Sequence, residues 1–218
     1  MSTRIPIQEK NLTIKGLLIS LTYIYKKLSS LKLNNFISFA VVAIMLSVPL
    51  FSLSAFGVDN VTSNKSQITL DQFVTYENST RGIKIDYPKG WTVIDQFGLG
   101  FFSPKENDSD TFQEGLLVSK GPHGNQSIDK LAAGVLAIYN SSLPNFKLIE
   151  SKGLTFHGNP AQNLIYTFNP GNGTIKVLES GATENNSIYI FQYRAQENKF
   201  DSYLPTIQRM IDSFKATK

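Results

Sequence analysis

From residue 72 onward, apolar and polar residues alternate in short runs, with the two-residue period typical of half-buried β-strands. The run Ile83, Ile85 and Tyr87 is the clearest, because charged side chains stand between its members. Runs of this kind, together with short continuous apolar runs, predict strands at 73–76, 83–87, 91–94, 99–102, 116–119, 146–150, 161–168, 174–183 and 187–195. Turn residues separate the last three runs, which predicts an antiparallel meander.

Two other stretches have the spacing of amphipathic helices. Residues 128–139 carry apolar side chains at helical intervals, and Ser127 precedes them as an N-cap. Residues 200–214 show the same spacing, and we expect regular helix to begin near Leu204, because Pro205 is tolerated in the first turn. The predicted fold class is α+β, with an antiparallel sheet of about six to eight strands sandwiched by helices.

The segment Phe36–Phe56 contains no charged residue. At about 1.5 Å per residue, its length of roughly 30 Å matches the hydrocarbon core of a membrane. Lysines lie just before it, and the positive-inside rule places the basic segment 1–35 in the cytoplasm. We therefore expect a single-pass membrane anchor at 36–56, followed by a polar tether at 57–70 and an extracytoplasmic domain at 71–218.

A signal peptide is the alternative interpretation of the same segment. Its apolar part would end at Pro49, and the small residues Ala55 and Gly57 would form a cleavage site. The domain would then be secreted after cleavage near Gly57. Both interpretations place the domain outside the cytoplasm.

The net charge of +4 and the pI near 9.1 come entirely from the N-terminal segment. Residues 1–57 hold six basic residues against one acidic residue, and the remainder is close to neutral. A nucleic-acid-binding domain needs a one-sided basic surface, so we expect no nucleic-acid partner. The chain has no cysteine, which excludes disulfides and thiolate metal sites.

Asn-x-Ser/Thr sequons are frequent after Gly57, where random placement of the same residues would give about two. They are candidate N-glycosylation sites, which supports an extracytoplasmic location, although asparagine, serine and threonine also gather in turns without carrying sugar. The eight acceptors are Asn60, Asn64, Asn78, Asn107, Asn125, Asn140, Asn172 and Asn185.

An acidic loop provides a candidate metal site. Glu106, Asp108 and Asp110 stand at alternate positions, and oxygen ligands of this kind suit Ca²⁺. The EF-hand pattern is not met, because Thr111 stands where that loop needs glycine. A solvated loop without metal is the alternative.

Several local strings, in their shared order, resemble the PsbP C-terminal (PsbP-like) family, whose fold is the Mog1/PsbP α/β/α sandwich. The strings are Gly82–Trp91, Phe146–Ser151, Gly158–Ala161, Leu164–Tyr166, Tyr189–Arg194 and Met210–Phe214. The family takes its name from an extrinsic photosystem II subunit that supports calcium and chloride retention, and relatives serve as assembly factors and surface proteins.

Three hypotheses for function follow. The first is a non-enzymatic extracytoplasmic binding or structural module that holds an extracytoplasmic or membrane protein partner, as an accessory or assembly factor of a membrane complex. The second is a small-ligand or Ca²⁺-binding domain that uses the acidic loop or a groove between sheet and helix. The third is an extracytoplasmic hydrolase, which would need a Ser-His-Asp triad assembled in space, since no nucleophile-elbow motif is present.

Overall fold

A computed structural model describes residues 72–217, apart from 96–97, 125 and 172. The predicted cytoplasmic segment, hydrophobic segment and tether (1–35, 36–56 and 57–70) lie outside the described residues. Among the helices of the described part, none is long and apolar enough to cross a membrane. The strands are β1 (Phe73–Asn78), β2 (Ile83–Pro88), β3 (Thr92–Asp95), β4 (Leu99–Phe102), β5 (Gly115–Pro122), β6 (Lys147–Phe156), β7 (Asn159–Phe168), β8 (Ile175–Glu184), β9 (Ser187–Gln196) and β10 (Lys215–Ala216). The helices are α3 (Ile128–Ser142) and α4 (Phe200–Ser213).

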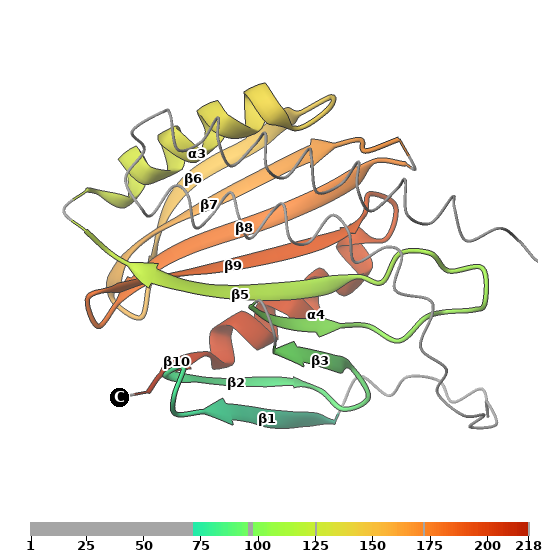
Figure 1. Cartoon of the computed structure of the whole chain (residues 1–218), viewed down its shortest axis with the longest axis horizontal. Coiled ribbons are helices and arrows are strands. Elements are labelled where there is room, and N and C mark those ends of the chain that lie inside the picture. The colour runs from blue at the N-terminus through green and yellow to red at the C-terminus, as the bar shows by residue number, and fades with distance from the viewer. Residues whose placement is uncertain (1–71, 96–97, 125, 172, 218) are drawn as a thin grey trace, which may run out of the picture.

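Seven strands form one antiparallel sheet in the order β3-β4-β5-β9-β8-β7-β6 (Figure 1). The predicted meander is β7-β8-β9, and β8 and β9 are joined by the two-residue turn Asn185-Asn186. Both asparagines have positive φ, as the favoured hairpin turns require. The α+β class and the size of the main sheet are confirmed.

A second sheet of three strands, in the order β1-β2-β10, is not hydrogen-bonded into the first and lies beside β3 (Figure 1), where the Tyr76 hydroxyl of β1 donates to Asp95 (2.6 Å). Its centre is β2, and β10 joins it at the C-terminal end of the described chain. Ile83 and Ile85 of β2 are buried in the core that α4 also enters. The sequence predicted the strands of this sheet except β10, but did not predict that they form a separate sheet.

The two helices cover opposite faces of the seven-stranded sheet, because side chains alternate between the faces along each strand. On β8, Leu178 belongs to the core with α4, whereas Val177 belongs to the core with α3. Tyr193 of β9 reaches the first turn of α4, where its hydroxyl donates to the Phe200 carbonyl (2.8 Å). Each face of the sheet therefore has its own apolar core.

The expected start of the last helix was wrong. Helix α4 begins at Phe200, and Pro205 lies inside it. Proline cannot donate to the carbonyl four residues earlier, which normally ends a helix. Here Phe200 is 1% exposed and packs on the Tyr193 ring (centroids 4.8 Å apart), so tertiary packing holds the first turn in place.

Strand β6 is also longer than predicted. It was expected at 146–150, and it extends to Phe156, with a bulge between Leu148 and Glu150. Nine of its ten residues are exposed, so burial imposes no alternating pattern that the sequence could reveal. Its pairing with β7 across the whole length explains why it is nevertheless a strand.

Candidate functional site

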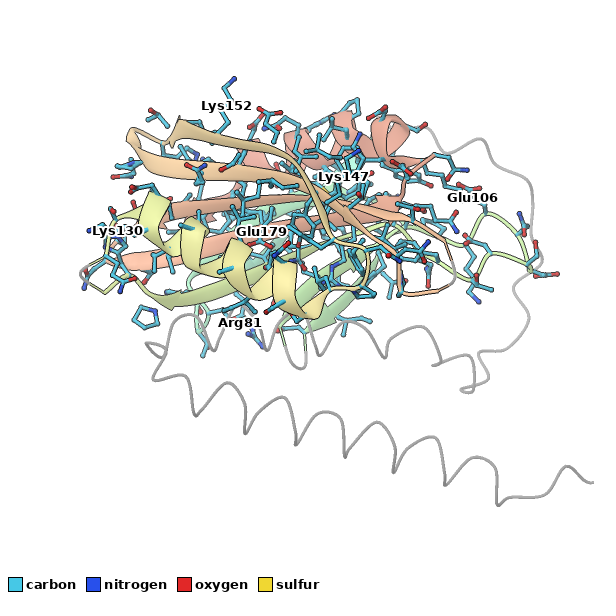
Figure 2. The ribbon with its side chains drawn as sticks, turned by 90° about the horizontal axis from the view of Figure 1, so that it is seen from above. Arg81, Glu106, Lys130, Lys147, Lys152 and Glu179 are labelled. Atoms are coloured by element: carbon cyan, nitrogen blue, oxygen red, sulfur yellow. The ribbon has the colours of Figure 1, made fainter. Side chains whose placement is uncertain are left out.

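A buried carboxylate lies between α3 and the sheet. Glu179 in the middle of β8 is 5% exposed, and its Oε2 atom accepts three hydrogen bonds. The donors are Gln192 Nε2 (2.7 Å), the Tyr139 hydroxyl (2.8 Å) and the Tyr166 hydroxyl (3.3 Å). They come from β9, α3 and β7, so the network ties the helix to three adjacent strands. Figure 2 shows Glu179 under α3.

Burial dominates the electrostatics of this network. It raises the pKa of Glu179, while the bonds from Gln192, Tyr139 and Tyr166 and the charge of Arg194 act in the opposite direction. Burial also raises the pKa of both tyrosines well above the ordinary value and lowers that of Arg194. Arg194 Nε donates to Gln192 Oε1 (2.8 Å), so Gln192 links the guanidinium to the carboxylate. The arrangement holds helix and sheet together through a polar network in a mainly apolar core.

A small cavity adjoins Glu179 under α3. Its volume is about 30 Å³, enough for roughly one water molecule. Apolar side chains of α3, β7 and β9 form most of its wall, with Gln162 and Glu179 as the polar lining. The sequence suggested a groove between sheet and helix as a ligand site. The cavity found there has the volume of about one water molecule, and ligand binding stays a prediction.

A second buried carboxylate lies where the acidic loop joins β5. Glu114 is fully buried, and no side chain donates a hydrogen bond to its carboxylate; the nearest donors are the backbone N–H groups of Glu114 itself and of Gln196. The buried Ser103 hydroxyl beside it is also unpaired, and the Ser103 amide donates to the Glu114 carbonyl (2.8 Å). Burial raises the pKa of Glu114, while the backbone N–H of Glu114, the charge of Lys199 and the backbone N–H of Gln196 act in the opposite direction. These two polar groups are the natural place for an internal water.

The loop that carries the calcium prediction is ordered by its own side chains. Asp110 accepts the backbone N–H of Glu106 and of Phe112, each at 3.0 Å. The Glu106 carboxylate forms an ion pair with Lys199 at the start of α4 (2.9 Å), and Asp108 is exposed. No three His, Asp or Glu side chains in the described ranges are placed to hold a metal ion. In this arrangement the three carboxylates do not form a ready Ca²⁺ ligand set, and the site stays a prediction.

The sequons fall in different environments. Asn107, Asn140 and Asn185 are exposed, in the acidic loop, on α3 and in the β8–β9 turn. Asn78 is half-buried, and its amide donates to the Tyr76 hydroxyl (3.2 Å). The remaining acceptors, Asn60, Asn64, Asn125 and Asn172, lie outside the described residues.

The exposed large apolar side chains of the described part gather on one strand. Ile149 is 50% exposed, and Leu148 and Leu154 are 39% and 37% exposed. All three belong to β6, the terminal strand of the large sheet, and Val74 on β1 is the other exposed residue of this kind. We call the outer side of β6, from Lys147 to Phe156, the β6 edge. It combines exposed apolar side chains with the position of a terminal strand.

The chain matches the PsbP-like protein family over residues 37–216. It belongs to this family. Of solved structures, the solution structure of cyanobacterial PsbP from Synechocystis sp. PCC 6803 is similar with a TM-score of 0.52 at 16% identity, covering 71% of this chain and 98% of the other. That likeness shows the fold.

Two further structures of low similarity come from other bacteria. LpqN, involved in cell envelope biogenesis of Mycobacterium tuberculosis, matches at 14% identity and a TM-score of 0.49, covering 67% of this chain and 91% of that one. A Pseudomonas aeruginosa protein of unknown function matches at 16% identity and a TM-score of 0.49, covering 65% and 94%. Among curated proteins, no sequence matches this PsbP-like chain.

Sequence reasoning grouped Glu114 with the acidic loop and did not predict that Glu114 and Glu179 of this PsbP-like domain are buried. A signal was present for Glu179, because a single acidic residue interrupts the apolar run of β8 and a single arginine, Arg194, interrupts that of β9. Opposite charges inside adjacent buried strands indicate a buried polar network. No comparable signal marked Glu114, which closes a polar loop.

Two further side chains, Trp91 and His157, have structural roles. Trp91 lies in the core beside Tyr203. His157 stacks on Phe156, and its Nδ1 atom lies 3.3 Å from a Glu184 carboxylate oxygen. Contacts of this kind stabilise a hairpin end.

Proposed function

We propose that this PsbP-like protein is a non-enzymatic, extracytoplasmic module that binds protein through the β6 edge, in an accessory or assembly role at a membrane complex. The observation that supports it is the concentration of exposed Leu148, Ile149 and Leu154 on a terminal strand. A terminal strand offers backbone N–H and C=O groups to an added strand, which provides affinity, while side chains at alternate positions provide specificity.

The surroundings of the buried Glu179 support the same proposal, because they leave little room for a substrate. Glu179 is enclosed by its three donors, and the cavity beside it has the volume of about one water. An organic substrate needs a pocket of about 300 Å³ or more. The exposed edge is therefore the larger recognition surface.

Affinity capture from membranes of the source organism tests the proposal. The full-length chain serves as bait, beside an Ile149→Lys variant and a Val74→Lys variant. Val74 is the matched control, because it is an exposed apolar residue on the edge strand of the other sheet. We expect the same protein to be captured by wild type and Val74→Lys and to be lost with Ile149→Lys. Capture that is equal with all three baits, or absent with all, contradicts the proposal.

A second candidate function is binding of Ca²⁺ or a small ligand at the acidic loop. It is favoured by the buried Glu114, which no side chain hydrogen-bonds and which lies close enough to Asp110 for that charge to raise its pKa. Calorimetric titration of the full-length chain with Ca²⁺ tests it, with Asp108→Asn and Asp110→Asn as variants. Saturable heat at or below millimolar Ca²⁺ that both variants abolish supports this function, and no heat in wild type excludes it.

A further inference from the structure

The β6 edge is open along its whole length in the described chain. β6 pairs with β7 on one side, and no described strand pairs with the other side. The centre of the strand, Glu150-Ser151-Lys152, carries two opposite charges on one face, because residues two apart share a face. Both charged side chains are exposed, and within the described ranges neither forms an ion pair. Figure 2 shows Lys152 projecting from the sheet margin.

The spacing of these charges restricts how two such edges can pair. When two identical strands pair antiparallel about a two-fold axis, opposite residues must lie on the same face of the continuous sheet. The axis therefore lies midway between one residue and the same residue of the second copy, and these two residues stand directly opposite each other. An axis at Glu150 sets two carboxylates against each other, and an axis at Lys152 sets two ammonium groups against each other, which is unfavourable.

An axis at Ser151 gives the opposite result. Glu150 of each copy then lies directly across from Lys152 of the other copy, so two attractive pairs form at the centre of the interface. The exposed Ile149 and Leu154 flank these pairs and lose exposed apolar surface on pairing. Charges on a terminal strand usually prevent edge-to-edge pairing. In β6, the order of Glu150 and Lys152 disfavours pairing about either of these residues and favours pairing about Ser151.

We propose that the occupant of the β6 edge is a second copy of this chain, paired antiparallel about Ser151. The inference rests on the proposed function, since it names the partner of the same surface. The two sheets join into one continuous sheet across the axis. The partner is specified by charge order at the centre and by apolar contact on either side, and main-chain hydrogen bonds supply much of the affinity.

Charge reversal tests the register. In Glu150→Lys both central pairs become Lys–Lys, and in Lys152→Glu both become Glu–Glu, so we expect each variant alone to dimerise at least about tenfold more weakly than wild type. An equimolar mixture of the two variants restores attraction at both pairs, as does the double variant E150K/K152E. The measurement is the mass distribution of the full-length chain in mild detergent, by sedimentation.

Cysteine cross-linking tests the axis independently, because the chain has no cysteine of its own. Opposite residues of an antiparallel pair have Cα atoms about 4.5–5.5 Å apart, which suits a disulfide. We expect Ser151→Cys to form a disulfide-linked dimer in membranes under mild oxidation. Thr155→Cys is the matched control, an exposed residue on the same face of β6. Its two copies would be about eight residues apart, roughly 27 Å, and should not cross-link.

Each outcome decides the inference. A dimer that is lost in the single reversals, regained in their mixture and cross-linked at residue 151 supports it. A wild-type monomer, no recovery in the mixture, or equal cross-linking at 151 and 155 overturns it. If the chain is monomeric but captures another protein in an Ile149-dependent manner, the second copy is excluded and the proposed function stands. If it neither dimerises nor captures protein, both fail.

Discussion

At the scale of single residues, this PsbP-like domain buries two glutamates, Glu179 and Glu114, in different surroundings. Glu179 receives three side-chain donors, whereas Glu114 receives no side-chain donor. A buried carboxylate without partners costs more than one with full hydrogen bonding. Glu179 therefore helps to hold helix and sheet together, whereas the burial of Glu114 lowers the stability of the fold.

Removing the acceptor at Glu179 should be strongly destabilising. In Glu179→Leu, the Gln192 amide and the Tyr139 and Tyr166 hydroxyls stay buried and lose their acceptor, which we expect to cost about 3–5 kcal/mol. For a domain of this size, the melting temperature should fall by roughly 6–20 °C. Thermal melting of the full-length chain, followed by the fluorescence of its single tryptophan, measures this. Glu179→Gln keeps one acceptor oxygen and should lose less than half as much, and an equal loss would contradict the role of the network.

Glu114 should make stability depend on pH. Because burial raises its pKa in the folded chain, the folded state holds this proton more tightly than the unfolded state. Its contribution to stability is then greatest below the ordinary glutamate pKa of about 4.5 and falls as the pH rises through the raised value. Glu114→Gln should match wild type near pH 4 and be more stable at pH 8, by about 1 kcal/mol or more.

Melting curves of Glu114→Gln and wild type between pH 4 and pH 8 measure this difference. The raised pKa of Glu179 is common to both proteins and cancels in the comparison. Glu197→Gln, at an exposed position in the turn before α4, is the control. A variant that is less stable than wild type at pH 8 would show that the Glu114 carboxylate has a stabilising partner there.

At the scale of elements, α4 is held by packing in spite of an internal proline. Pro205 is exposed, so its ring adds little to the core, and it leaves the carbonyl of Asp201 without a helical donor. The helix forms because residues on its inner face, such as Ile207 and Met210, are fully buried against the sheet. Local propensity and tertiary packing disagree here, and packing prevails.

Pro205→Ala should therefore stabilise the protein. Alanine restores the missing N–H and has high helix propensity, which is offset in part by the greater freedom of the unfolded chain. We expect a gain of about 1–2 kcal/mol, or roughly 2–8 °C in melting temperature. Gln208→Ala, an exposed change on the same helix, should shift the melting temperature by little. Destabilisation by Pro205→Ala would mean that the proline ring makes a necessary contact.

At the scale of the whole molecule, the order of strands and helices could be predicted from the sequence, because alternation and helical spacing follow from burial. The extent of β6 could not, since an exposed strand has no burial pattern. The separate small sheet could not either, because the pairing of β2 with β10 joins distant parts of the chain. The acidic loop was predicted from spacing alone, and the Lys199 ion pair that engages Glu106 comes from another element.

The proposed extracytoplasmic location predicts which sequons carry sugar. Expressed in a host that performs N-glycosylation, the full-length chain should be modified at Asn107, Asn140 and Asn185, whose side chains are exposed. Asn78 should stay unmodified, because its amide is engaged with Tyr76 and Asp95. Loss of one glycosidase-sensitive mass step in each Asn→Gln variant measures this. A chain with no sugar at any of them would contradict translocation in that host.

The two margins of the large sheet differ in length. β6 runs for ten residues, whereas β3 at the opposite margin has only four. A chain with two long margins could join further copies at both ends and grow into a fibre. With one long margin, growth ends as soon as that margin is covered. If the β6 edge pairs with a second copy as proposed, this asymmetry limits assembly through the large sheet to a closed pair.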